Sequence, residues 1–164
     1  MSLKTMKTLM KFDSYSLEDT MAFGADMAKK MKAGDIICLC GSLGAGKTAF
    51  AKGFADGLGV SGHVNSPTFT LMQVYEDGRL PLYHFDLYRL AELLDEDIQL
   101  DYDTLEDIGF FDYMEADGVC LIEWAEYGRD FIPDRAAWIM IKRNEDRGGE
   151  YRTIDVKEGW QCIS

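Results

Sequence analysis

The 164-residue chain has little cysteine, little histidine and no long apolar run. Its four cysteines include no C-x-x-C pair, and His63 and His84 lie far in sequence from any pair of cysteines, so a metal site of cysteine and histidine ligands is not expected. No apolar run approaches the roughly 18 residues of a membrane-spanning helix, and the first residues show no signal-peptide pattern. We therefore expect a cytoplasmic protein with no membrane association, whose cysteines are buried structural thiols.

Positive charge is absent from one long stretch. Eleven acidic residues and no lysine or arginine fall between Glu92 and Asp117, in a chain of net charge −12. The rest of the chain is nearly balanced, and no strongly basic face is visible that could hold a nucleic acid backbone. Direct, tight binding of RNA or DNA is therefore not expected. The acidic stretch can be a solvated helix face, a docking surface for a basic partner, or both.

Residues 41–48 form the chain's most informative motif, G-x-x-x-x-G-K-T, which is the phosphate-binding P-loop. The apolar run Ile36–Cys40 before it predicts a buried parallel strand, and the residues after it can continue as a helix. Glycines allow the backbone N–H groups and the positive end of the helix dipole to face an anion. We expect a nucleoside triphosphate to be bound by Gly41, Ser42, Leu43, Gly44, Ala45, Gly46, Lys47, Thr48 and Ala49.

The periodicity of the remaining chain predicts an α/β fold. Ser16 is an N-cap candidate for a helix that runs to Met31. The other elements expected are a hairpin of 69–75 with 80–85, an amphipathic helix through Leu105, Ile108, Phe111 and Met114, a buried strand at 119–122, and a closing hairpin of 138–141 with 152–156. With 47% apolar residues and no repeats or linkers, residues 1–164 should form a single P-loop NTPase domain whose mixed, partly antiparallel sheet is flanked by helices.

Glu123 ends the predicted strand at 119–122, where a Walker B carboxylate would hold or orient Mg²⁺ and its water. Glutamate replaces the commoner aspartate there and reaches one methylene further. Within the P-loop, Lys47 would bridge the terminal phosphates and Thr48 would offer its hydroxyl to the metal. The neighbouring Trp124 can pack beside the nucleotide or cap the core, and the sequence does not decide between these positions.

Two further residues are candidates for chemistry. Asp86 ends another predicted strand and could orient water or Mg²⁺, although it could equally cap a helix or form an ion pair. Thr68 follows Pro67 and could turn its hydroxyl toward the γ-phosphate, or could simply belong to a turn. Arg89 and Arg129 are the candidates in this chain for an arginine finger.

The absence of an N-K-x-D motif leaves guanine-specific recognition without support, so ATP is the expected nucleotide. Three functions are compatible with these residues: an Mg²⁺-dependent ATPase that works with partners, a small-molecule kinase, and a nucleotide-gated binding module. A kinase needs an arginine-rich lid, whereas Arg143, Arg147 and Arg152 fall in a predicted hairpin.

Taken together, these motifs resemble the bacterial ATPases of tRNA threonylcarbamoyladenosine biosynthesis, the TsaE family, over nearly the whole chain. The resemblance is carried by the P-loop and by residues 65–71, 84–90, 106–109 and 121–124. It implies that Thr48 and Glu123 hold Mg²⁺, that Thr68 is the switch residue, and that Asp86 with Trp124 supports hydrolysis.

The resemblance also implies partners. Members of this family dock on the TsaB and TsaD proteins, which modify tRNA, so contact with tRNA would be indirect and ATP hydrolysis would support turnover of the complex. Independently of the resemblance, the sequence gives no clear signal for an arginine finger, so hydrolysis by the chain alone should be slow. Two positions depart from the family pattern: Ala49 replaces a frequent threonine, and Ala125 replaces a frequent proline. Loss of the hydroxyl at Ala49 could weaken a contact to the α-phosphate.

Overall fold

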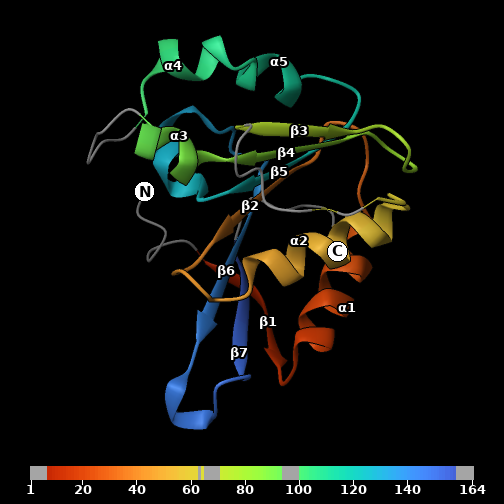
Figure 1. The fold of residues 1–164 in the computed structure, drawn as a ribbon, viewed down its shortest axis with the longest axis vertical. Helices are drawn as coiled ribbons and strands as arrows, with labels where there is room; N and C mark the ends of the chain where they lie inside the picture. Colours follow the sequence, from red (N-terminus) through yellow and green to blue (C-terminus); the bar gives the residue numbers. More distant parts are fainter. Residues whose placement is uncertain (1–6, 63, 65–70, 94–99, 158–164) are drawn as a thin grey trace.

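The computed structural model describes residues 7–62, 64, 71–93 and 100–157. Within them, seven strands form one sheet in the order β1-β7-β6-β2-β5-β4-β3 (Figure 1). Strands β6, β2, β5 and β4 are parallel, while the β1/β7, β7/β6 and β4/β3 pairs are antiparallel. The strands are β1 (Thr8–Ser14), β2 (Ile36–Cys40), β3 (Met72–Tyr75), β4 (Leu82–Asp86), β5 (Val119–Glu123), β6 (Ala137–Arg143) and β7 (Arg152–Lys157).

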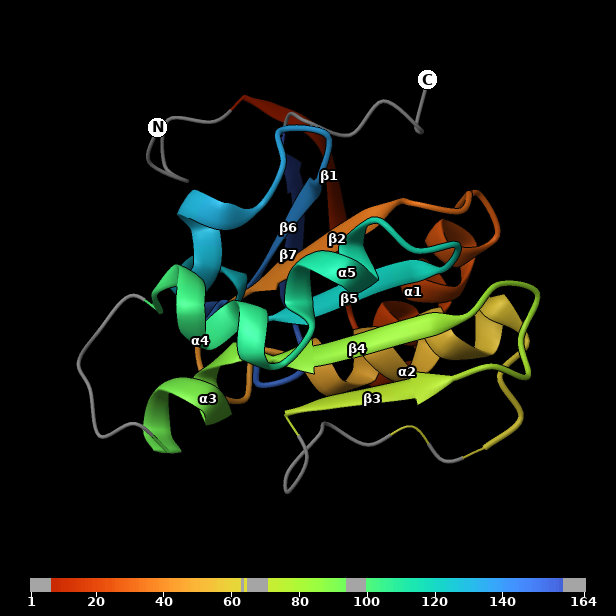
Figure 2. The ribbon, with the colours of Figure 1, turned by 90° about the horizontal axis from the view of Figure 1, so that it is seen from above.

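Helices cover both faces of this sheet (Figure 2). Helices α1 and α2 pack on one face, and α3, α4, α5 and the segment η2 lie on the other. Their bounds are α1 (Leu17–Ala28), α2 (Lys47–Leu58), α3 (Leu87–Leu93), α4 (Tyr102–Asp107), α5 (Phe110–Met114), η2 (Ala125–Phe131) and η3 (Glu145–Arg147). In the part of the chain that is described, no helix is long and apolar enough to cross a membrane.

The central strands are apolar without interruption because both of their faces are buried. In β2, Ile37 and Leu39 contact the core under α1 and α2, whereas Ile36 and Cys38 contact the core on the opposite face. Cys38, Cys40 and Cys120 are buried, as predicted, and Cys162 lies outside the described residues. Burial raises the pKa of Cys120 to about 12, so its thiol is protonated and unreactive at neutral pH.

Helices α1 and α2 approach one another closely because glycine faces the contact. A Cβ atom at Gly53 would lie 1.9 Å from the carbonyl oxygen of Met21, and one at Gly24 would lie 2.5 Å from that of Phe50. Any larger side chain at these positions would force the helices apart. This close contact fixes the direction of α2, whose first turn follows the P-loop.

Most of the predicted elements are confirmed. Ser16 caps α1 by accepting a hydrogen bond from the Asp19 backbone N–H at 3.1 Å. The strand at Ile36–Cys40, the helix after the P-loop, the strand at 119–122 and both hairpins are present, although residues 69 and 70 of the first hairpin lie outside the described residues. The α/β class and the mixed, partly antiparallel sheet are also confirmed.

One predicted helix is wrong in its extent. The amphipathic spacing around residues 105–114 predicts one helix, but the structure has α4 and α5 separated at Gly109. Gly109 adopts φ 76°, in the left-handed region, which ends α4 and starts α5. Strand β1, helix α3 and the segment η2 are present in addition to the predicted elements.

Candidate functional site

The P-loop connects the end of β2 to the start of α2. Helix α2 begins at Lys47, and its N-cap residue Gly46 has φ 115° and makes no side-chain capping hydrogen bond. The first N–H groups of this helix are therefore available to an anion, which the helix dipole also favours. At the start of the loop, a Cβ atom on Gly41 would lie 2.5 Å from the carbonyl oxygen of Ile141, so glycine permits the loop to pass close to β6.

The Lys47 side chain is folded back under the loop. Its Nζ donates hydrogen bonds to the carbonyl oxygens of Gly41 and Ser42, the latter at 2.9 Å, and lies 4.0 Å from the centroid of the Trp124 ring. Burial lowers the pKa of Lys47, while the nearby carboxylates, that of Glu123 foremost, favour its charged form. A bound triphosphate would add further negative charge and stabilise the ammonium group.

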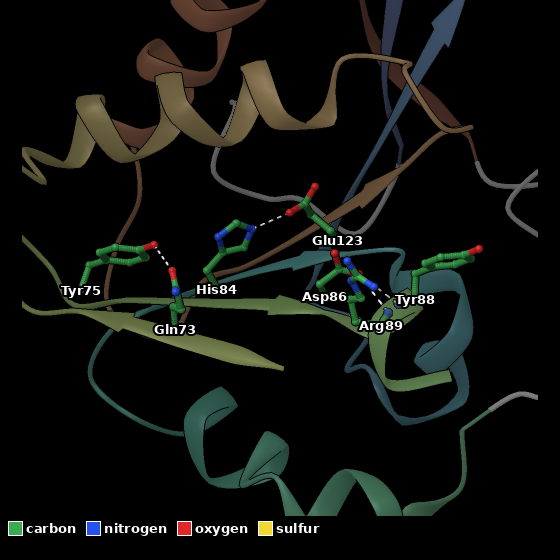
Figure 3. A network of polar contacts seen from close by, with 7 residues as sticks. All are labelled: Gln73, Tyr75, His84, Asp86, Tyr88, Arg89 and Glu123. Atoms are coloured by element: carbon green, nitrogen blue, oxygen red, sulfur yellow. Dashed lines mark hydrogen bonds and ion pairs between the residues drawn. The ribbon is translucent and has the colours of Figure 1, made fainter. Parts of the chain in front are cut away.

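Two carboxylates end adjacent parallel strands beside this lysine. Asp86 and Glu123 are opposite one another in the β4/β5 register, and both residues are buried (Figure 3). Burial raises the pKa of Asp86, and the charge of Glu123 raises it further. Adjacent carboxylates of this kind favour a bound cation, because the cation offsets their mutual repulsion.

Asp86 also caps a helix. Its Oδ1 accepts hydrogen bonds from the backbone N–H groups of Tyr88 at 3.1 Å and Arg89 at 3.3 Å, at the start of α3. The prediction that Asp86 caps a helix is therefore confirmed. It does not exclude a role at the ligand site, because the same side chain also lines the pocket described below.

Trp124 has an unusual backbone conformation. Among the described residues it is the only non-glycine with positive φ, at 55°, a conformation that costs on the order of 1–3 kcal/mol. Its ring packs against Tyr88, with 4.9 Å between centroids, and carries the Lys47 ammonium over its face. The structure thus places Trp124 beside the P-loop and also against the core under α3. Its predicted contact with a nucleotide stays a prediction.

These elements surround a pocket of about 590 Å³. The predicted residues that line it are Leu43, Gly44, Ala45, Gly46, Lys47, Thr48, Ala49, Asp86, Glu123 and Trp124. Gly41 and Ser42 are not among the lining residues, but their carbonyl oxygens accept hydrogen bonds from Lys47, which is. Thr68 lies outside the described residues, so its predicted role stays a prediction.

The two arginine-finger candidates are separated by the structure. Arg89 lines the pocket and forms an ion pair with Glu92 at 3.1 Å. Arg129 lies instead over the Trp138 ring, 5.9 Å from its centroid. Of the two, Arg89 is the one placed to reach a nucleotide.

Sequence reasoning missed two residues at the site. Arg152, at the start of β7, donates from Nε to the carbonyl oxygen of Ala45 at 2.8 Å and lines the pocket. His84 contacts Glu123, with 2.7 Å between Nε2 and Oε2 (Figure 3). A signal existed for His84, because a histidine inside the apolar run of β4 is unusual. No sequence signal indicated a role for Arg152, because its contact with Ala45 depends on how the last hairpin packs.

The residues present fit a nucleoside triphosphate with Mg²⁺. The pocket combines a backbone cradle for phosphate, a lysine and two carboxylates. Among the described residues no group of three or more His, Cys, Asp or Glu could hold a metal alone. Mg²⁺ commonly binds through one or two protein oxygens together with phosphate oxygens and water, which is the arrangement that Thr48 and Glu123 would support.

Comparison with known proteins shows which family the chain resembles. A family model described as "Threonylcarbamoyl adenosine biosynthesis protein TsaE" matches residues 14–154. The chain belongs to the TsaE family. A Bacillus subtilis TsaE protein is 44% identical over 158 residues, covering 96% of this chain and 92% of the relative.

Other members of the TsaE family extend the comparison. A Treponema pallidum TsaE protein is 41% identical over 133 residues, covering 81% of this chain and 91% of the relative. The crystal structure of Bacillus subtilis YdiB superposes with a TM-score of 0.72 at 36% identity, covering 94% of this chain and 88% of that one. The P-loop fold expected from the motif is thereby confirmed.

Proposed function

We propose that this protein is an Mg²⁺-dependent ATPase that serves as an accessory subunit of tRNA threonylcarbamoyladenosine biosynthesis. Its relatives carry this biosynthetic process in their names. We further propose that it docks on the TsaB and TsaD proteins and that ATP hydrolysis supports their turnover. Contact with tRNA would then be indirect, in keeping with the absence of a strongly basic segment.

The observation that carries the ATPase proposal is the meeting of Lys47, Asp86 and Glu123 in one pocket at the start of α2. Phosphoryl transfer needs little covalent chemistry from the protein, and depends on positioning and on neutralising charge at the phosphates. A P-loop supplies both, and carboxylates at the ends of neighbouring strands supply the metal and water contacts.

The residues divide the work as follows. The N–H groups at the start of α2 bind the phosphate oxygens, and Lys47 leaves the carbonyls of Gly41 and Ser42 to bridge the terminal phosphates. Thr48 and Glu123 would hold Mg²⁺, which when bound would neutralise charge on the terminal phosphates. Asp86 and Trp124 border the space beside the γ-phosphate, where Asp86 accepts a hydrogen bond from the attacking water. Thr68, which lies outside the described residues, would turn its hydroxyl toward the γ-phosphate.

Hydrolysis by the isolated chain should be slow. An arginine finger contributes about 10³- to 10⁵-fold to hydrolysis in related P-loop enzymes. Arg89 lines the pocket but is held by Glu92, so a docked partner would either release Arg89 or contribute an arginine of its own.

The test is phosphate release from ATP in water with no added acceptor, measured with and without TsaB and TsaD. We expect slow release by the protein alone, acceleration by the pair, and strongly reduced but measurable release in Glu123→Gln with ATP binding intact. Full-speed hydrolysis without partners would contradict the activation mechanism. Release that requires a small-molecule acceptor would instead identify a kinase.

A further inference from the structure

His84 is a buried polar residue that stands behind the nucleotide pocket. It lies in the middle of β4, between Tyr83 and Phe85, and its relative exposure is 0%. The described residues that line the pocket do not include it, yet its ring points at Glu123, which does line the pocket (Figure 3).

The sheet register explains how the two side chains meet. Strands β4 and β5 are parallel, with His84 opposite Leu121 and Asp86 opposite Glu123. Because side chains alternate between the faces of a sheet, His84, Asp86 and Glu123 all point to one face. Leu121 belongs to the core under α1 and α2, so this is the face that carries the P-loop helix.

The contact between them is short and fully enclosed. His84 Nε2 lies 2.7 Å from Glu123 Oε2, and the side chains are 0% and 3% exposed. A carboxylate accepts hydrogen bonds and cannot donate them, so the ring nitrogen that faces it carries the hydrogen. The neutral ring is therefore the Nε2–H tautomer, and Nδ1 can only accept.

Nδ1 makes this histidine costly to bury. Within the described residues it has no hydrogen-bond partner. A buried polar group without a partner lowers stability, and a leucine or phenylalanine at the same position would avoid this cost. We therefore attribute the histidine at this position to the hydrogen bond between its Nε2 and Glu123.

We propose that His84 is a positioning residue for ATP hydrolysis, which holds the Glu123 carboxylate in one orientation against the nucleotide pocket. The inference rests on the proposed function. A glutamate side chain has three rotatable torsions, and the contact with His84 Nε2 restricts the directions that the Glu123 carboxylate samples. Removing a hydrogen-bond partner that orients a metal-binding side chain typically lowers activity by 10- to 100-fold.

Two amide variants separate this role from a structural one. The terminal nitrogen of glutamine is as many bonds from Cα as Nε2 of histidine, whereas that of asparagine matches Nδ1. In single-turnover hydrolysis with the partners present, we expect His84→Asn to be about 10-fold slower and His84→Gln to stay within about 3-fold of the unsubstituted protein. The dissociation constant for ATP should change by less than about 2-fold in both, because His84 touches no ligand.

A double-mutant cycle tests whether His84 acts through Glu123. In a Glu123→Gln background, adding His84→Asn should cause no further loss of the residual rate. An equal proportional loss in both backgrounds would show that His84 only supports the fold, and would overturn the inference. Equal losses in His84→Gln and His84→Asn, or full activity in His84→Asn, would overturn it as well.

A measurement without ATP keeps the inference separate from the proposed function. Ring ¹⁵N NMR of the free protein should show His84 as the Nε2–H tautomer, with a shift that changes in Glu123→Gln; His84→Asn assigns the signal. An Nδ1–H tautomer, or no response to Glu123→Gln, would overturn the contact. If the protein releases no phosphate under any condition, the proposed function fails, whereas the tautomer still decides whether His84 orders Glu123.

Discussion

The ammonium nitrogen of Lys47 lies 4.0 Å from the centroid of the Trp124 ring, while the same group donates to the carbonyl oxygens of Gly41 and Ser42. Lysine and tryptophan therefore form a contact that a bound triphosphate must rearrange, because the phosphates compete for the ammonium group. A positive charge over an indole face is worth about 0.5–2 kcal/mol, so a triphosphate can displace it.

This contact predicts a fluorescence signal. Binding of MgATP should change the emission of Trp124 as Lys47 moves away from its ring. Trp124→Phe should remove the change, whereas Trp138→Phe should preserve it, because Trp124 lines the nucleotide pocket and Trp138 does not. A nucleotide-dependent change that persists in Trp124→Phe would show that Lys47 and Trp124 do not respond together.

Arg152 should strengthen nucleotide binding through the P-loop. It donates to the carbonyl oxygen of Ala45, so Arg152→Gln should loosen the loop and weaken ATP binding by about 10-fold, the equivalent of one or two hydrogen bonds. The control is Arg143→Gln, which removes the same charge from an exposed position of the same hairpin. Equal weakening in both, measured by calorimetry, would attribute the effect to net charge alone.

Gly53 should be essential to the α1/α2 contact. In Gly53→Ala the new methyl group would lie 1.9 Å from the Met21 carbonyl oxygen, and we expect a loss of about 2 kcal/mol in the free energy of unfolding. A Cβ at Gly62 meets nothing within 4 Å, so Gly62→Ala should stay within about 0.5 kcal/mol. Denaturant unfolding of the two variants gives the comparison, and equal stabilities would disprove the steric account.

Asp86 should reduce the stability of the nucleotide-free protein as pH rises. Burial raises the pKa of Asp86, so the folded state retains its proton above pH 3.8, where the unfolded chain releases it. The stability that this proton provides is present below pH 3.8 and is lost as pH rises through the raised pKa. Asp86→Asn keeps a capping oxygen and no charge, so it should melt at a higher temperature than the unsubstituted protein at pH 8.

Thermal unfolding between pH 4 and pH 8 checks the direction in which the pKa of Asp86 is shifted. The advantage of Asp86→Asn should shrink as pH is lowered towards 4, because the aspartate then becomes protonated in the folded state. An advantage that grows at low pH would show that the pKa of Asp86 is lowered in the folded state.

The sequence predicted the site best where chemistry is local in the chain. The P-loop pattern identifies its own ligand, and the apolar run that ends at Glu123 places a carboxylate beside it. Asp86 was ambiguous because a helix cap and a pocket residue have the same local pattern, and its side chain serves as both.

Contacts between distant segments could not be read in this way. His84 meets Glu123 only because β4 and β5 are neighbours in register, and Arg152 meets Ala45 only because β7 returns beside β6. The division between α4 and α5 was not predicted because the apolar spacing continues past Gly109. The spacing of apolar residues carries no information about a single residue with a left-handed backbone conformation.

Equilibrium dialysis of the purified protein against labelled ATP with Mg²⁺ tests the central claim most directly, because every role proposed for these residues requires a bound triphosphate. We predict saturable binding of one ATP per chain, strongly weakened in Lys47→Ala. No binding of ATP by the folded, unsubstituted protein would contradict the account.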